Sequence, residues 1–288
     1  MARWRGGGSL SSSKIFAVPL SRLQSFLLRL LAGQRSPDSY VAGGIALNRD
    51  GPRFSDDIDI FHDDDSRLVA IAESDAAIIM EAGFDLSWRP GHGSGKRAAQ
   101  VRGLDDETQL EWVADADFRF FPAQPDDLFG YVLHPADLAT NKAAAAADRR
   151  APRDIVDLLT IHERILPLGA VISAAVGRFP GMTPEEMLAE IRRHGTFTVD
   201  EFQALAVETP LDPRQTHRRI KTMLDDAAAF IQKLPSDAVG FLFLDGHRPV
   251  QPDVALVDRY TKRAGARRGY WPSSSEIGTA MLEHYRNE

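Results

Sequence analysis

The first half of the chain alternates between hydrophobic patterns typical of strands and of helices. In residues 57–61, aspartates alternate with isoleucines, and this two-residue period predicts a strand with one buried face. Apolar positions at helical spacing in residues 65–83 predict an amphipathic helix soon after it. Further strands are expected at residues 84–89, 97–102 and 109–113, with a possible strand at residues 128–133. We therefore expect this half to be of the α/β (α+β) class.

After His134 the pattern becomes helical. An alanine-rich segment at residues 137–148 predicts one helix. Pro152 begins the next, at residues 153–165, because proline fits the first turn of a helix. Further helices are expected at residues 183–194, 199–206, 213–234 and 275–285. Residues 238–244 fit either a short strand or part of a turn. The other segments predict a mainly helical C-terminal half.

The length of 288 residues exceeds that of a typical single domain, so two folded units are expected. We place a flexible tail at residues 1–18, a first domain at residues 19–133 and a helical domain at residues 134–288. Near the start of the first domain, leucines recur at helical spacing, at positions 20, 23, 27, 30 and 31. Arg22 and Arg29 interrupt this apolar run, which favours an amphipathic helix over a signal sequence.

Composition narrows the class of protein. The chain has no Cys, which excludes disulfides, thiolate chemistry and zinc fingers and fits a reducing cytoplasm. No apolar run approaches the roughly 20 residues that span a bilayer, so no membrane partner is expected. The formal net charge of −7 argues against a uniformly basic coat for nucleic acid but allows a local basic patch. We therefore expect a cytoplasmic globular protein.

Two short motifs in the first half carry the candidate chemistry. Gly43 and Gly44 open a short helix, where residues without side chains let backbone amides approach a phosphate closely. Farther along, Asp57 and Asp59 stand two positions apart on a strand, so both carboxylates project from one face. Neighbouring carboxylates repel each other unless a cation lies between them. Hard oxygen ligands beside a phosphate favour Mg²⁺, or Mn²⁺ as a substitute.

Each motif alone has a simpler interpretation. A Gly-Gly pair before a helix usually marks a turn, and an Asp-Ile-Asp segment is more often the solvated end of a strand. Found together, in this order and with Ser55 between them, the two motifs favour a functional site.

These residues resemble the signature of the nucleotidyltransferase superfamily that includes DNA polymerase beta. Residues 53–61, Arg-Phe-Ser-Asp-Asp-Ile-Asp-Ile-Phe, resemble the Arg-x-Ser-x-Asp-Ile-Asp segment of its AbiEii/AbiGii type. That type comprises toxins of type IV toxin–antitoxin and phage-abortive systems, including the MenA/MenT-like proteins. Residues 137–142 and 149–158 resemble the family's helical lysine and its Arg-Asp-x-x-Asp-Leu helix start. The resemblance extends from Tyr40 to Leu159 and implies a nucleotidyltransferase fold, with a mixed sheet flanked by helices.

The resemblance also implies roles for individual residues. Asp57 and Asp59 are expected to hold the metal ions, and Lys142 to neutralise charge on the phosphates as a point cation. Asp154 is expected to orient Lys142 or to assist the acceptor. Asp157, one turn along, fits either the site or an exposed helix surface. The predicted substrate-binding residues are Gly43, Gly44 and Ser55, which would contact the triphosphate, together with Arg53 and Arg153.

The superfamily usually has a third metal carboxylate on a later strand. Glu111 is the candidate, because Leu110 and Trp112 would face the core while Glu111 points away. Asp115 and Asp117 compete for the same role. Three histidines lack the partner spacing of acid–base groups and are interpreted as structural, namely His62, His134 and His162.

Basic residues gather at three places, around Lys142, in residues 214–221 and in residues 262–268. Each cluster alone is usually a solvated face, but three of them in an acidic chain favour a polyanionic acceptor. The family resemblance implies an RNA acceptor, with a transfer-RNA 3′ end as the leading candidate, and a possible cognate antitoxin. We therefore expect a metal-dependent nucleotidyltransferase that moves a nucleoside monophosphate from a nucleoside triphosphate to RNA.

Two alternatives stay open from the sequence. One is a nucleotidyltransferase that acts on a small molecule or on a protein side chain. The other is a nucleotide-binding regulator that kept the fold and lost catalysis. The presence of both glycines, both strand aspartates and Lys142 argues against the regulator, because a degenerate site need not keep all of them.

Overall fold

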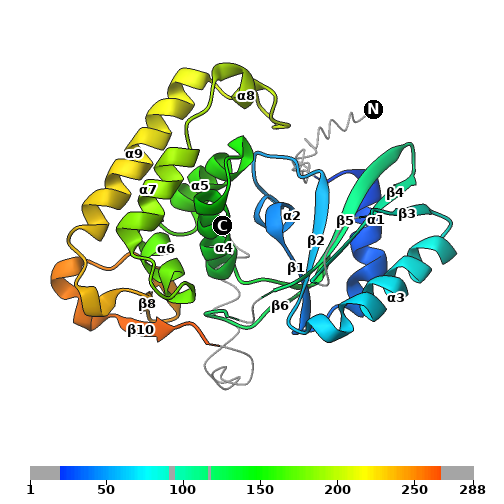
Figure 1. Cartoon of the computed structure of the whole chain (residues 1–288), viewed down its shortest axis with the longest axis horizontal. Coiled ribbons are helices and arrows are strands. Elements are labelled where there is room, and N and C mark those ends of the chain that lie inside the picture. The colour runs from blue at the N-terminus through cyan, green and yellow to red at the C-terminus, as the bar shows by residue number, and fades with distance from the viewer. Residues whose placement is uncertain (1–19, 91–94, 116–117, 267–288) are drawn as a thin grey trace, which may run out of the picture.

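The computed structural model describes residues 20–90, 95–115 and 118–266, and its first half is built on a seven-stranded sheet (Figure 1). The strand order is β3-β4-β5-β2-β1-β7-β6. The strands are β1 (Ser39–Ala42), β2 (Asp57–His62), β3 (Asp85–Trp88), β4 (Lys96–Gly103), β5 (Asp106–Ala114), β6 (Gln124–Asp126) and β7 (Gly130–Val132). The sheet is mixed, because β1 is parallel to β7 and β2 is parallel to β5, whereas the other neighbouring pairs are antiparallel. The expected mixed sheet is therefore confirmed.

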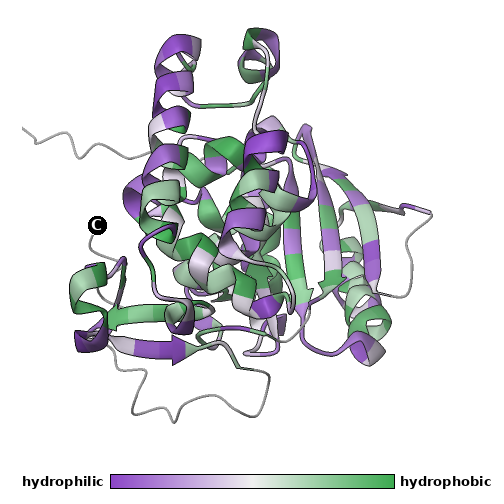
Figure 2. Cartoon of the chain, turned by 60° about the vertical axis from the view of Figure 1, so that its left-hand side comes forward, coloured by the Kyte–Doolittle hydropathy of each residue, from purple (hydrophilic) through white to green (hydrophobic). Residues whose placement is uncertain are grey.

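The strands predicted from the alternating pattern are present, with bounds that shift by a few residues. In β2 the isoleucines Ile58 and Ile60 are buried, whereas Asp57 and Asp59 are half-buried on the opposite face. Figure 2 shows hydrophilic and hydrophobic segments alternating along strands of this sheet. The possible strand at residues 128–133 corresponds to the shorter β7. Strand β2 therefore has one face for the core and one for other contacts.

Helices α1 (Arg22–Leu31) and α3 (Leu68–Glu81) cover one face of the sheet (Figure 1). The predicted leucine-rich helix is α1, whose first turn is capped by the side chain of Ser21. The helix predicted at residues 65–83 begins as a short 3₁₀ helix, Asp65–Arg67, before α3. Leucines of both helices pack against Ile58, Ile60 and Trp112, so the apolar face of the sheet lies beneath them. The other face is left for the helical half.

The short helix α2 (Gly43–Leu47) follows β1, as the double glycine predicted. The α-helices described in the second half are α4 (Pro135–Asp148), α5 (Pro152–Arg164), α6 (Leu168–Ala175), α7 (Pro184–His194), α8 (Val199–Gln203) and α9 (Pro213–Ile231). Helix α4 lies between the sheet and the other helices in Figure 1 and contacts α2, α5, α6 and α7. Helix α6 was not expected from the sequence, whereas α4, α5, α7 and α9 lie where helices were predicted.

A second, three-stranded sheet packs on the helical half. Its order is β10-β8-β9, with β8 (Phe241–Asp245), β9 (Arg248–Val250) and β10 (Thr261–Ala264). The segment that fitted either a strand or a turn contains both, because residues 236–238 form a 3₁₀ helix and β8 begins only after Gly240, whose φ is +86°. The second half is thus mainly helical with a small added sheet.

Strand β10 also reaches the segment between β5 and β6. Arg263 donates a hydrogen bond to the carbonyl oxygen of Phe120, and its guanidinium lies 4.4 Å from the ring centroid of Phe121. Just beyond β10, Ala266 pairs with Arg119 in an isolated bridge. The segment between β5 and β6 is therefore held by a strand that follows it by more than a hundred positions.

The tail predicted at residues 1–18 and the helix predicted at residues 275–285 lie outside the described residues. Within the part that the structure describes, no helix combines the length and the apolar character required to cross a bilayer.

Candidate active site

An open cavity of about 220 Å³ lies between the sheet and helix α4. The residues that line it come from the turn after β1, from β2 and the loop before it, from β5, from one side and the end of α4, and from the start of α5. The lining residues are Gly43, Gly44, Arg53, Asp57, Asp59, Phe61, Glu111, Val113, Leu138, Asn141, Lys142, Ala145, Arg149 and Arg153. Two further predicted site residues bond to this lining, because Ser55 donates to Asp57 at 3.0 Å and Asp154 accepts from Arg149 at 2.8 Å. The structure therefore brings the predicted site residues to one place.

Strand β2 supplies the acidic floor of this cavity. Asp57, Asp59 and Phe61 alternate with buried isoleucines, so the three side chains share the face turned toward α4. The parallel pairing with β5 places Glu111 beside Asp59 and Val113 beside Phe61. The isoleucine face of β2 is buried beneath α1 and α3, and this packing holds the two carboxylates side by side on the opposite face.

The double glycine is required by the close approach of its neighbours. Gly43 has a φ of +69°, and a Cβ there would overlap the carboxylate of Asp59. A Cβ on Gly44 would lie 2.7 Å from Nη2 of Arg53 and 2.8 Å from Oγ of Ser55. Both positions therefore need glycine so that the turn can lie directly against the acidic strand.

Asp59 is held in an environment that opposes its charge. Burial, followed by the negative charge of Asp57, raises the pKa of Asp59 to about 7, although the nearby Lys142 acts in the opposite direction. Asp57 forms a long ion pair with Arg153, whose Nη1 lies 3.8 Å from Oδ2. The protein's own basic groups thus leave this carboxylate pair only partly compensated.

Lys142 lies on the opposite wall, and Asp157 holds it in place. Its Nζ is 2.8 Å from Oδ2 of Asp157 but 4.0 Å from Oδ1 of Asp154. Asp157 is fully buried, so the exposed helix surface considered for it is excluded. Burial opposes its ionisation, but Lys142 and Arg53 more than offset this effect and lower its pKa.

The sequence did carry a signal for the burial of Asp157. Its neighbours on both sides, from Ile155 to Ile161, are almost all apolar, so this carboxylate interrupts a hydrophobic run. A charged side chain at such a position is rarely stable without a fixed partner of opposite charge.

The sequence matches the model of a known protein family. The family model described as "Nucleotidyl transferase AbiEii toxin, Type IV TA system" matches residues 25–238. The chain belongs to this family. It is accordingly a nucleotidyltransferase toxin of the type IV toxin–antitoxin class. No curated protein matches the chain.

Among solved structures, the chain is similar to MenT4, a nucleotidyltransferase toxin from Mycobacterium tuberculosis H37Rv. The two are 19% identical, with a TM-score of 0.50, and the match covers 75% of this chain and 83% of that one. This likeness confirms the nucleotidyltransferase toxin fold, which the seven-stranded mixed sheet and its flanking helices form.

Within this AbiEii-family site, Arg53 is bonded chiefly to the protein. Its Nε and Nη2 donate to the two carboxylate oxygens of Asp157 at 2.9 and 3.0 Å, and its Nη1 donates to the carbonyl oxygen of Phe54. Asn48 donates to the same carboxylate at 2.9 Å and to the carbonyl oxygen of Gly44 at 3.1 Å. Asp157 therefore links the helical half to the glycine turn as well as to Lys142.

The structure describes two of the three candidates for a third metal carboxylate and places them apart. Glu111 lines the cavity, where its Oε2 lies 2.6 Å from Nζ of Lys96. Asp115 instead pairs with Arg178 at 2.6 Å, away from the cavity lining. Asp117 lies outside the described residues. Among the residues that the structure describes, no group of three or more acidic, His or Cys side chains is arranged to hold one ion, which leaves Asp57 and Asp59 as a pair.

The predicted basic clusters and histidines differ in their relation to the site. Arg149 and Arg153 line the cavity, whereas Arg150 pairs with Glu201 outside it. In the second cluster, Arg219 pairs with Glu163 and Lys221 with Asp225.

Burial lowers the pKa of His62 and of His134 to about 3, and burial also lowers the pKa of His162. None of these three histidines lines the cavity.

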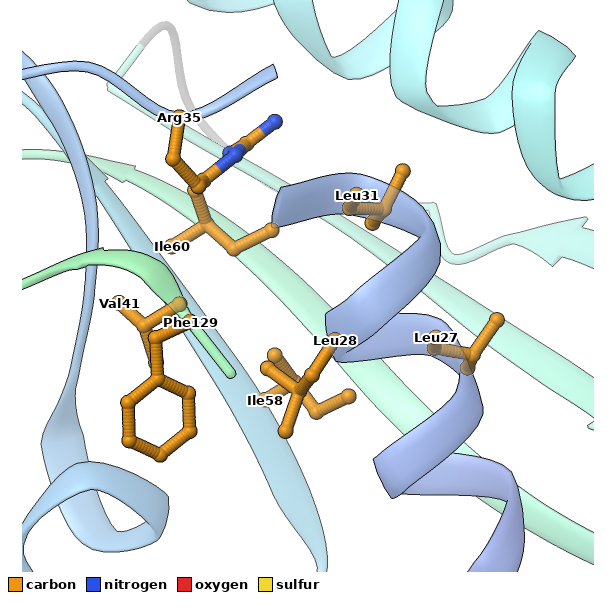
Figure 3. A pocket seen from close by; sticks show the side chains of 8 residues that line it. All are labelled: Leu27, Leu28, Leu31, Arg35, Val41, Ile58, Ile60 and Phe129. Carbon is orange, nitrogen blue, oxygen red and sulfur yellow. The ribbon is translucent and has the colours of Figure 1, made fainter. Parts of the chain in front are cut away.

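A second hollow, beneath α1, has a different character. Figure 3 shows leucines of α1 facing Val41, Ile58, Ile60 and Phe129, with Arg35 at one side. Its volume is about 10 Å³, which is about the size of one water molecule. This hollow is a packing gap of the apolar core. Of the two, the cavity beside α4 is the one that is large enough for a substrate.

Proposed function

We propose that the cavity beside α4 transfers a nucleoside monophosphate from a nucleoside triphosphate to the 3′ end of an RNA in a metal-dependent reaction. The observation that carries this proposal is the meeting of Gly43, Gly44, Asp57, Asp59 and Lys142 in one cavity. In this reaction an acceptor oxygen bonds to the α-phosphorus, the bond from that phosphorus to the bridging oxygen of pyrophosphate breaks, and the acceptor hydroxyl loses its proton.

Asp57 and Asp59 fit a divalent cation such as Mg²⁺ or Mn²⁺. Both are hard oxygen donors on one face of β2, and the raised pKa of Asp59 shows that the pair lacks positive charge. When bound, the ion supplies charge stabilisation to the phosphate oxygens. Glu111 stands beside Asp59 and is the closest candidate for an additional ligand, although Lys96 pairs with it here.

The remaining residues bind and orient the triphosphate. The backbone of Gly43 and Gly44 forms a turn free of side chains, and Ser55 stands beside it. Lys142 supplies a fixed positive charge to the phosphates, because Asp157 holds its ammonium group against the cavity wall. Asp154 fixes Arg149 at the rim, and Arg53 supports the glycine turn through Asp157.

Arg149 and Arg153 support a polyanionic acceptor. Both line the cavity, with side chains 48% and 39% exposed, so a phosphate backbone can reach them from solvent. The family resemblance favours a transfer-RNA 3′ end as the acceptor and a cognate antitoxin as a protein partner. In this proposal residues 19–133 form the catalytic unit, and residues 134–288 complete the cleft and select the acceptor.

Radiolabelling tests the proposal. Total RNA and total protein are incubated with the protein, Mg²⁺ or Mn²⁺, and each labelled triphosphate in turn. We expect label in RNA, and we expect Asp57→Asn to abolish it while the circular dichroism spectrum is unchanged. Asp56→Asn is the matched control, because this exposed neighbour does not line the cavity and should retain activity. Label in protein alone, or unchanged labelling by Asp57→Asn, would overturn the proposal.

A further inference from the structure

The end of the cavity away from the arginines has no role in the reaction described above. It is formed by Phe61 and Val113 from the sheet and by Leu138 and Asn141 from α4. Phe61 and Leu138 belong to one hydrophobic cluster, so this end is apolar apart from the Asn141 amide. Because Phe61 follows Asp59 by two positions on β2, the apolar end lies next to Asp57 and Asp59, the predicted metal ligands.

Asn141 is oriented by a partner that can only donate. Nη1 of Arg178 donates to Oδ1 of Asn141 at 2.9 Å. A guanidinium has no acceptor, so the oxygen of the amide must face Arg178 and the Nδ2 group must face the other way. Asn141 lines the cavity, and its Nδ2 makes no hydrogen bond within the described part of the chain. The amide therefore offers the cavity a donor and no free acceptor.

Arg178 is itself fixed between the two halves of the molecule. It lies in the 3₁₀ helix Val176–Arg178 that follows α6, and its Nη2 donates to Oδ1 of Asp115 at 2.6 Å. Asp115 comes directly after β5, and its backbone amide donates to the carbonyl oxygen of His62 at 2.8 Å. The orientation of Asn141 is thus set by a carboxylate at the end of the catalytic sheet.

We propose that this apolar end binds the base of the nucleoside triphosphate, and that Asn141 selects bases whose facing edge carries a carbonyl oxygen. This proposal rests on the proposed function, since it assumes that the α-phosphate lies at Asp57 and Asp59. Phe61 supplies an apolar surface for any base, because every base has a π face. Nδ2 of Asn141 donates to O4 of uracil or O6 of guanine but opposes the amino groups of cytosine and adenine.

Arg178 is a positioning residue in this arrangement. It does not line the cavity, but it prevents the Asn141 amide from turning its oxygen toward the base. Replacing both Arg178 and Asp115, as Arg178→Gln with Asp115→Asn, avoids leaving one half-buried charge without its partner. In this double variant Asn141 can present either its oxygen or its nitrogen, so selection between bases should weaken without a general loss of binding.

Equilibrium binding of the four triphosphates tests the proposal independently of any acceptor. Non-hydrolysable α,β-imido analogues of UTP, CTP, GTP and ATP are titrated in Mg²⁺ by calorimetry. We expect the natural chain to bind the UTP analogue about threefold to tenfold more tightly than the CTP analogue, and the GTP analogue likewise over the ATP analogue. Asn141→Asp replaces the donor by an acceptor of the same shape while Arg178 stays paired, so both ratios should invert.

The ratios contain their own control for charge and for folding. The added negative charge of Asn141→Asp weakens all four triphosphates alike, because they carry the same charge, so it cancels in each ratio. Asn141→Leu, which has a similar size and no polar group, should bring both ratios close to one, as should the Arg178→Gln, Asp115→Asn pair. Melting temperatures identify any variant that has not folded.

The outcomes separate this proposal from the proposed function. If the natural chain binds none of the four analogues, the triphosphate site itself is wrong and both proposals fail. If all four bind and the ratios do not change in the Asn141 variants, base selection by Asn141 is wrong, while the proposed function stands. A natural preference for CTP and ATP over UTP and GTP would also overturn the assignment of Asn141.

Discussion

The molecule contains two pairs of aspartates in opposite electrostatic states. Asp57 and Asp59 lie two positions apart on β2, and Asp154 and Asp157 lie three positions apart on α5. The helix pair is the more deeply buried, with side chains 1% and 0% exposed. Even so, the pKa of Asp157 is lowered, whereas the pKa of Asp59 is raised to about 7.

The difference lies in the cations that the fold supplies. Asp157 accepts from Nε and Nη2 of Arg53 and pairs with Lys142, and Asp154 pairs with Arg149. The strand pair is compensated from farther away, because the half-exposed Arg153 lies 3.8 Å from Asp57, and Lys142 and Lys96 act on Asp59 at longer range. Burial alone therefore does not set the state of a carboxylate. The charges of Asp154 and Asp157 are balanced by side chains of the protein itself. Asp57 and Asp59 have room for a cation from solution.

The largest effect is expected from Asp59→Asn. The amide removes half of the proposed ion site, so nucleotidyl transfer should fall by about 1000-fold or more, which corresponds to several kcal/mol of lost stabilisation. The metal-free protein should melt at a higher temperature above pH 7, because a buried like charge has been removed. Initial rates and thermal scans measure the two effects. Retention of a tenth of the activity would contradict the comparison.

Asp157→Ala should have the opposite effect on stability. It leaves Arg53 and Lys142 without their buried partner, so the free energy of unfolding should fall by about 3–5 kcal/mol. Urea denaturation measures this change. Glu163→Ala is the control, since it breaks an exposed pair with Arg219 and should cost less than about 1 kcal/mol. Equal losses in the two variants would show that Asp157 is not the central contact inferred here.

The pH dependence of stability should report the charge of Asp59. Its pKa is about 7 in the folded chain against an ordinary value of 3.8, so the folded state keeps a proton that the unfolded chain has lost. The resulting stabilisation is present below pH 3.8 and is lost as the pH rises through about 7. Denaturation of the natural chain and of Asp59→Asn across this range isolates Asp59 from Asp137, whose pKa burial also raises to about 7.

The same group should couple proton release to ion binding. At pH 6, Mn²⁺ should displace most of one proton from Asp59, and at pH 8.5 almost none. Calorimetry in buffers of different ionisation enthalpy counts these protons. A proton count that does not change with pH would mean that the ion does not compete at Asp59.

The smallest effect is expected from Arg153→Gln. This arginine is half-exposed and makes one long pair with Asp57, so its contribution to stability should be below about 1 kcal/mol. Its removal should raise the affinity for Mn²⁺ by up to about fivefold, because a competing cation is lost. A titration with Mn²⁺ in the absence of nucleotide measures this. Weaker binding of Mn²⁺ would show that Arg153 supports the ion instead of competing with it.

Local patterns predicted much of the catalytic half. The alternation in β2 placed the two carboxylates on one face, and the double glycine predicted the turn that lies against them. These features depend on neighbours in the sequence, where period and residue type are informative. The family resemblance added the mixed sheet and identified Lys142.

Other features depend on contacts that local patterns do not contain. The bond between Arg53 and Asp157 spans 104 positions, so the sequence left two interpretations of Asp157. Helix α6 was missed because all of its residues are buried, and a helix that is apolar on every side has no helical period. The orientation of Asn141 depends on Arg178 and Asp115, and these three residues come from three separate segments.

The bond between β10 and the segment that follows β5 has a consequence for synthesis. Chains emerge from the ribosome N-terminus first, so the seven-stranded sheet can assemble long before residues 261–266 exist. Arg263 and Ala266 then have to reach Phe120 and Arg119 across the finished helices. A nascent chain therefore holds its catalytic strands and α4 through contacts such as Arg53 with Asp157, and the contact of β10 with Phe120 is added only after the last strand of the small sheet has been made.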